Sequence, residues 1–139
     1  MYKELDEFIE NNQDDIIITG GVKEEIIHNL EKELGFKFRE EIREYLSKYG
    51  IIMGYGVEML GCGKNGESSL IRDTQRFRKV GLEEEYIVIR NVDEWIYCFN
   101  NNDGKISSWD RIERNHLIKT NSFEQYILNE LVEAKEEWD

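Results

Sequence analysis

One stretch of the sequence, residues 86–109, constrains the fold most strongly because it predicts adjacent antiparallel strands. It begins with the nearly continuous apolar run Tyr86–Ile89, which is typical of a central strand buried on both faces. A second β-rich run covers Trp95–Phe99, and the turn-forming residues Asn100–Gly104 separate it from a third run at Lys105–Trp109. The second and third runs therefore predict a β-hairpin.

Helical patterns precede and follow this β-rich stretch. Apolar residues recur at helical spacing in five segments: 2–12, 22–34, 39–49, 68–81 and 122–138. In the last segment, Ser122 and Gln125 have the spacing of a capping box, and the apolar stripe is expected to pack on the sheet. Short strands are predicted at 15–19 and 57–60. This order predicts an α+β fold, with a central antiparallel or mixed sheet flanked by helices.

The chain is predicted to form a single domain spanning residues 1–139. This length is close to that of a typical domain, and the sequence has no proline, no Gly/Ser linker and no internal repeat. The glycine-rich segment Gly54–Gly66 contains an incomplete phosphate-binding pattern, because its third glycine falls one position short. Close backbone packing or a turn is the simpler explanation, and a small-ligand cleft beside this segment is a further possibility.

No catalytic or metal-binding pattern is present among the reactive residue types. His28 and His116 lie far apart without ligands at helical spacing, and His116 is assigned to a loop. If Gly104 occupied the invariant glycine position of a calcium loop, Phe99 would have to be the first ligand, which its side chain cannot be. Cys98 lies within a predicted strand and is interpreted as a core residue. We therefore predict a protein that is not an enzyme and that has no cofactor or metal.

The charge is strongly negative and unevenly distributed. The chain has 30 Asp and Glu residues against 18 Lys and Arg residues, a formal net charge of -12, and the acids concentrate near both ends. The one basic cluster comprises Arg72, Arg76, Arg78 and Lys79. This balance argues against binding to a nucleic-acid backbone, which requires a basic surface. Two interpretations stay open: the acids only keep the protein soluble, or they attract a basic protein partner.

The sequence also bears on location. No apolar run approaches the roughly 18 residues that a membrane span requires. The N-terminal stretch is acidic and amphipathic, unlike a signal peptide. A cytoplasmic protein without membrane contact is therefore expected.

Aromatic residues stand beside acids at the ends of the predicted hairpin. Asp93 and Glu94 precede Trp95, and Asp110 follows Trp109. Either the tryptophans are core residues with solvent-facing acids beside them, or the rim of the hairpin offers an aromatic anchor of the kind that interface hot spots favour. On the second interpretation, the candidate partner-binding residues are Glu58, Asp93, Glu94, Trp95, Asp103, Trp109 and Asp110.

A family resemblance rests on the order of several short segments. The segments Ile27–Phe38 and Tyr45–Gly50 resemble the N-terminal signature of the SUKH superfamily, of the Smi/Knr type, in which one helix ends in "LG" and the next near "YG". Similar segments follow in the family's order: Val57–Gly61, Tyr86–Ile89, Trp95–Asp110 and Ser122–Ile127. The resemblance covers roughly residues 20–137. One departure is that Phe38-Arg39 replaces the proline that usually precedes the second signature helix, which puts the start of that helix in question.

The resemblance implies a fold and a role. The fold is α+β, and bacterial members are immunity proteins that neutralise a co-encoded polymorphic toxin, often a nuclease, whereas eukaryotic relatives are linked to cell-wall regulation. No catalytic residues come with the family. The expected partner is a basic toxin domain bound without catalysis, by a monomer or weak homodimer. The alternative is a regulatory scaffold that binds a cellular protein or peptide.

Overall fold

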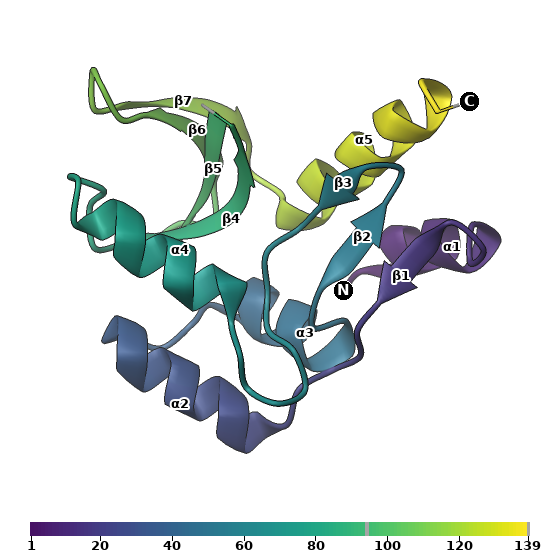
Figure 1. Cartoon of the computed structure of the whole chain (residues 1–139), viewed down its shortest axis with the longest axis horizontal. Coiled ribbons are helices and arrows are strands. Elements are labelled where there is room, and N and C mark those ends of the chain that lie inside the picture. Colours follow the sequence, from purple (N-terminus) through teal and green to yellow (C-terminus); the bar gives the residue numbers. More distant parts are fainter. Residues whose placement is uncertain (94, 139) are drawn as a thin grey trace.

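The computed structural model describes residues 1–93 and 95–138, and these residues form five helices and seven strands (Figure 1). The helices are α1 (Lys3–Asn11), α2 (Glu24–Leu34), α3 (Glu40–Lys48), α4 (Ser69–Arg78) and α5 (Phe123–Glu136). The strands are β1 (Ile16–Ile18), β2 (Ile52–Gly54), β3 (Val57–Glu58), β4 (Tyr86–Val92), β5 (Trp95–Asn100), β6 (Ile106–Asp110) and β7 (Asn115–Thr120). The predicted α+β class is confirmed.

The strands form two antiparallel sheets rather than one central sheet. Their orders are β1-β2-β3 and β4-β5-β6-β7, and the two sheets meet where the Leu60 amide donates to the Ile89 carbonyl over 2.9 Å. The prediction that Tyr86–Ile89 forms a central strand was wrong, because β4 is an edge strand. It is nevertheless buried, since α4 covers its edge and the Val88 amide donates to Thr74 Oγ1 over 2.8 Å.

Two strands were not predicted. β7 contains His116, which was wrongly assigned to a loop, and β2 ends at Gly54, the first residue of the glycine-rich segment. β7 does not alternate apolar and polar residues, because neighbouring Leu117 and Ile118 are both exposed. Its place in the sheet comes from pairing with β6, a long-range contact that no local pattern reveals.

The connection between α2 and α3 is held by side chains at the position where the SUKH proteins that this sequence resembles usually have proline. Glu31 accepts a hydrogen bond from the Phe38 amide over 2.7 Å. Asn101, in the β5–β6 turn, accepts from the Arg39 amide over 2.9 Å and donates to the Lys37 carbonyl over 2.8 Å. These three hydrogen bonds fix the chain just before α3, so this helix begins at Glu40 as the sequence pattern suggested.

The closing helix differs from its prediction at both ends. Ser122 caps α5 by accepting from the Gln125 amide, but the Gln125 side chain donates to Glu4 over 2.8 Å, so the capping box is only half formed. Trp138 was expected to pack on the sheet. It lies beyond the end of α5, is 57% exposed, and has its ring 6.0 Å from that of Tyr55.

The glycine-rich segment is explained by close backbone packing. A Cβ atom at Gly61 would lie 1.9 Å from the Gly50 carbonyl oxygen, a distance that no side chain tolerates. The next residue, Cys62, donates its amide to that same carbonyl over 3.1 Å. Glycine at position 61 therefore lets the segment after β3 lie against the end of α3.

Candidate protein-binding surfaces

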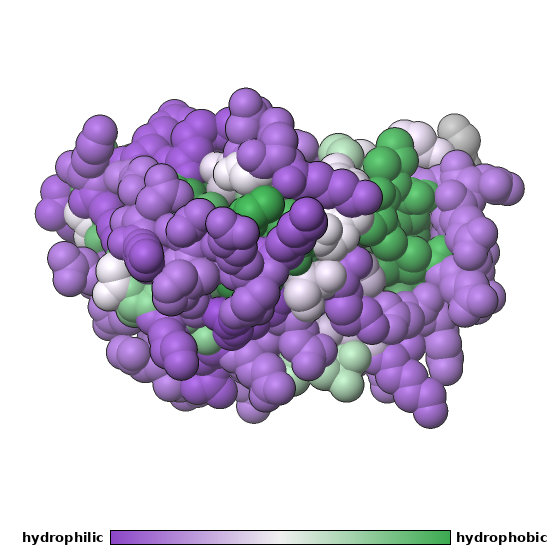
Figure 2. All heavy atoms as spheres, turned by 90° about the horizontal axis from the view of Figure 1, so that it is seen from below, coloured by the Kyte–Doolittle hydropathy of each residue, from purple (hydrophilic) through white to green (hydrophobic). Residues whose placement is uncertain are grey.

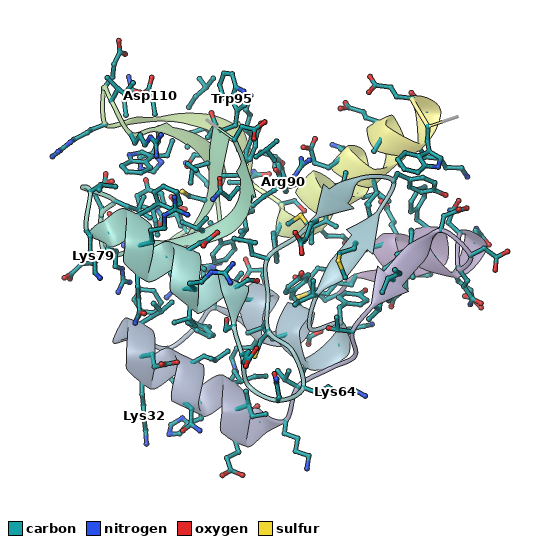
Figure 3. All side chains as sticks on the ribbon, in the orientation of Figure 1. Lys32, Lys64, Lys79, Arg90, Trp95 and Asp110 are labelled. Atoms are coloured by element: carbon teal, nitrogen blue, oxygen red, sulfur yellow. The ribbon has the colours of Figure 1, made fainter. Side chains whose placement is uncertain are left out.

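The fold separates the residues that were proposed as partner contacts. Asp93, in the β4–β5 turn, and Asp110, at the end of β6, lie at the same end of the four-stranded sheet as Trp95 (Figure 3). Asp103 lies in the β5–β6 turn at the opposite end. Glu58 is on β3, in the other sheet, and Glu94 lies outside the described residues. The residues that were predicted to form one contact surface therefore lie at three separate places in the fold.

A hollow of about 480 Å³ lies at the end of the sheet beside Trp95. Ser108 lines it and has larger cross-strand partners, Tyr97 on β5 and Leu117 on β7, of which Leu117 also lines the hollow. The most exposed apolar side chains of its lining are Trp95 (62%), Leu117 (65%) and Ile112 (87%). This shape and exposure are suited to receiving an apolar side chain from a partner.

Trp109 does not offer the surface that was expected of an interface anchor. It is only 2% exposed and packs edge-on against Phe77 of α4, with ring centroids 6.2 Å apart. On its other side lies His116, whose ring stacks on Tyr86 at 3.9 Å and whose Nδ1 is 2.7 Å from Ser107 Oγ. Of the two interpretations of the tryptophans, the core interpretation holds for Trp109 and does not hold for the exposed Trp95.

The two acidic ends of the chain meet in the folded protein. Helices α1 and α5 pack against each other, and Glu124 accepts a hydrogen bond from the Leu5 amide over 3.1 Å. The first fifteen residues carry six acids and one lysine, and α5 adds further carboxylates, so their charges combine into one surface. The exposed acids of these helices are Glu4, Glu7, Glu10, Glu133 and Glu136.

A second apolar surface lies on the outer face of the β1-β2-β3 sheet. Register pairs Ile17 with Met53, and Met53 with Glu58, so these three side chains share a face. The opposite face is buried through residues such as Ile16 and Ile52, whereas Ile17 is 62% exposed. Figure 1 draws these strands in front of α1, and Figure 2 shows apolar spheres among hydrophilic ones on the side where β1 lies.

Carboxylates border this outer face. Asp14 and Asp15 immediately precede β1 and are exposed, and Glu58 stands on the face itself and is also exposed. The Asp15 carboxylate lies 3.4 Å from the Tyr55 hydroxyl, which places it beside the β2–β3 turn. We call the set Asp14, Asp15, Ile17, Met53 and Glu58 the acid-rimmed face. An apolar centre within a charged rim is the usual composition of a protein interface.

Residues 5–132 match the family model described as SMI1-KNR4 cell-wall. The chain belongs to this family. The match spans both sheets and all five helices, apart from the first residues of α1 and the last residues of α5, which agrees with the resemblance seen in the SUKH signature segments. The hollow beside Trp95 and the acid-rimmed face thus both lie on the α+β fold of the SMI1-KNR4 family.

The cysteines of this SMI1-KNR4 domain have structural positions in the core. Both cysteines are free and buried, and burial raises the pKa of the Cys98 thiol and of the Cys62 thiol, which keeps them in the weakly nucleophilic protonated form. Across residues 1–93 and 95–138, no three His, Cys, Asp or Glu side chains are grouped so that they could hold a metal ion. Within the same residues, no helix is long and apolar enough to cross a membrane.

The basic cluster divides on folding. Arg78 donates to the Leu34 carbonyl over 3.1 Å and to the Glu84 carbonyl over 2.7 Å, so it ties α4 to two neighbouring segments. Arg72, Arg76 and Lys79 instead line an open hollow of about 500 Å³ on α4. Glu33 also lines this hollow and partly balances their charge. The cluster is therefore part structural and part solvated surface.

Proposed function

We propose that this protein is an immunity protein that binds a basic toxin domain, such as a nuclease, and blocks it without catalysis. The acid-rimmed face is the observation that carries the proposal. It combines the exposed Ile17 of β1 and the partly buried Met53 of β2 with the carboxylates of Asp14, Asp15 and Glu58, in a protein whose net charge is -12. Membership of the SMI1-KNR4 family supports the same role, because many of its SUKH relatives are immunity proteins.

The physical basis is complementarity of charge. A nuclease must present cations in order to hold nucleic acid, so an anionic inhibitor can occupy the same surface. Carboxylates at the rim accelerate encounter and fix orientation, while the apolar centre supplies most of the binding free energy once water is excluded. In this proposal Glu58 contributes to steering, and Ile17 and Met53 form the buried centre of the complex.

The remaining contacts proposed from sequence form a second group. Trp95 and Asp110 line the hollow at the end of the four-stranded sheet, where Trp95 is the exposed aromatic side chain, and Asp93 lies in the neighbouring β4–β5 turn. We propose this group as a second contact region for the toxin. Asp103 stands apart from both groups and Trp109 is buried, so neither belongs to the core of the proposed interface.

The test uses the C-terminal domain of the polymorphic toxin encoded beside this gene. Calorimetry measures its affinity for the immunity protein, and a toxin activity assay measures inhibition. The proposal expects a one-to-one complex that abolishes activity and weakens as salt rises from about 50 to 300 mM, because screening removes the attraction between charges. Absence of a complex refutes the proposal, and a complex that leaves activity intact favours the regulatory scaffold.

Variants then distinguish steering by the carboxylates of the acid-rimmed face from an effect of the total negative charge. Replacing Asp14, Asp15 and Glu58 together by their amides is expected to lower the association rate at low salt by about tenfold, with a smaller effect on dissociation. The control variant replaces Glu25, Glu33 and Glu40 together by glutamine, which removes three exposed carboxylates from α2 and the first turn of α3, away from this face. An association rate that falls equally for the control would show that only total charge matters.

A further inference from the structure

Trp138 is an exposed aromatic side chain at the border of the acid-rimmed face. Its ring lies 6.0 Å from that of Tyr55, with the two planes at 72°. Its Cζ3 atom lies 3.7 Å from the point where a Cβ of Gly56 would stand. Both neighbours belong to the β2–β3 turn, which Figure 1 draws beside α5. The indole therefore leans on this turn, while more than half of its surface stays open to a partner.

Tyr55 connects the indole to a carboxylate of the acid-rimmed face. The Tyr55 hydroxyl donates to Asn12 Oδ1 over 2.8 Å and lies 3.4 Å from Asp15 Oδ2. The Tyr55 ring is thus fixed by a buried hydrogen bond at one end and contacts Trp138 with its ring. Trp138 consequently has a rigid support, and Asp15 stands at the far end of that support.

The chain segments around Trp138 are strongly acidic. Residues 12–18, 51–60 and 133–138 together carry six carboxylates and one cation. The carboxylates, all exposed, are Asp14, Asp15, Glu58, Glu133, Glu136 and Glu137. The cation is Lys135, whose Nζ lies over the Phe8 ring of α1, 5.7 Å from its centroid. The local charge therefore has the same sign as that of the whole protein and is more concentrated.

The two exposed tryptophans differ in their charged surroundings. Trp95 and Trp138 are exposed to a similar extent. The hollow beside Trp95 is lined by one cation, Arg111, and one carboxylate, Asp110. Local charge does not favour a cation there, whereas around Trp138 it does.

An exposed indole among carboxylates selects a cationic side chain. The face of an aromatic ring attracts cations, indole does so most strongly, and arginine is the commonest partner because its planar guanidinium also stacks. The carboxylates strengthen this attraction and repel anionic groups, including the same surface of a second copy. We propose that Trp138 binds an arginine side chain of the toxin domain, with the guanidinium stacked on the indole. The identity of this partner rests on the proposed immunity function.

The first experiment tests the site without the toxin. NMR follows the indole N–H signals of the three tryptophans in the full chain, and the variants Trp95→Phe and Trp138→Phe assign them. The probe is a tetra-arginine peptide with blocked ends, added at low salt, where charge attraction is least screened. The control peptide contains citrulline, which has nearly the shape of arginine without its charge.

We expect the arginine peptide to give a saturating shift of the Trp138 signal that exceeds the shift of Trp95. The signal of the buried Trp109 should stay in place, and the citrulline peptide should move none of the three. An unmoved Trp138 signal overturns the proposal. A larger shift at Trp95, or an equal effect of the citrulline peptide, overturns it as well.

The second experiment measures the affinity of the toxin domain by calorimetry. Trp138→Leu keeps an apolar side chain but removes the aromatic face, and Trp138→Phe keeps a weaker aromatic face. We expect Trp138→Leu to raise the dissociation constant by about tenfold or more, and Trp138→Phe to raise it by less. Val80→Ala is the control, because it shortens an exposed apolar side chain just beyond α4. Circular dichroism verifies that each variant is folded.

The outcomes distinguish this inference from the proposed function. A toxin complex that Trp138→Leu weakens no more than Val80→Ala does overturns the role of Trp138 and leaves the immunity function standing. If no toxin complex forms at all, the proposed function fails. The peptide titration then decides by itself whether Trp138 binds arginine.

Discussion

The buried carboxylate of Glu31 is the most informative single position for the stability of this fold. Its side chain is 5% exposed and accepts hydrogen bonds from the Phe38 amide and from Arg43 Nη1, each over 2.7 Å. It therefore fastens the α2–α3 connection to the end of α2 and to α3 at once. We predict that Glu31→Ala destabilises the protein far more than removal of an exposed acid from the same helix.

The magnitude follows from the groups left without partners. Leaving a buried amide such as that of Phe38 unpaired costs about 1–3 kcal/mol. Arg43 loses a buried partner but keeps Glu24 and is 27% exposed, so its loss falls below the roughly 3–5 kcal/mol of a fully buried pair. We expect a loss of about 2–4 kcal/mol for Glu31→Ala and about 1–2 kcal/mol for Glu31→Gln, since the amide oxygen can still accept one hydrogen bond.

The assay is urea unfolding followed by tryptophan fluorescence, with equal slopes required for comparison of free energies. Glu33→Gln is the matched control, because this residue lies on the same helix and is exposed, and its change is expected to stay within about 0.5 kcal/mol. A Glu31→Ala variant within about 0.5 kcal/mol of wild type would refute the account of the connection. It would show that packing, rather than this carboxylate, holds the start of α3.

Three further predictions concern other positions. Trp109→Ala should cost about 3–5 kcal/mol of unfolding free energy, whereas Trp95→Ala should change it by less than about 0.5 kcal/mol; similar losses would contradict their contrasting burial. Partial burial raises the pKa of Asp6, but hydrogen bonds from Lys48 and Tyr49 lower it overall below its ordinary value of 3.8. Its contribution is therefore present above about pH 5 and lost as pH falls through the folded pKa, so the stability difference between wild type and Asp6→Asn should shrink between about pH 6 and pH 3. Thiol titration with a disulfide reagent should find both cysteines unreactive until the protein unfolds, and rapid labelling in the native state would contradict their burial.

Local patterns predicted most helices and the hairpin correctly. α3 was expected over 39–49 and spans Glu40–Lys48, and Ser68 caps α4 by accepting from the Ile71 amide, as one of two candidate serines. The turn Asn100–Gly104 connects β5 to β6, with Gly104 at a φ of 78°. These features depend on residues close together in sequence, where helical spacing, capping and turn preferences act directly.

Features that depend on long-range pairing were missed. β7 has no alternation to reveal it, and β4 has the composition of a central strand although it lies at an edge. The proposed contact residues were chosen for being aromatic or acidic, and burial then separated Trp109 from Trp95. Sequence neighbours cannot show this difference in burial. Trp109 is covered by Phe77 of α4 and His116 of β7, whereas Trp95 stays 62% exposed.

By itself, the sequence determined the class of fold, the family and the sign of the charge, because these follow from short-range spacing and from composition. Only the tertiary structure decided which charged and exposed apolar side chains lie together on one surface. Packing of α1 on α5 joins two acidic ends that are more than a hundred residues apart, and pairing of β1 with β2 places Ile17 beside Met53. Surfaces of this kind consist of side chains brought together from distant segments, so their composition is fixed only when the helices and sheets have packed.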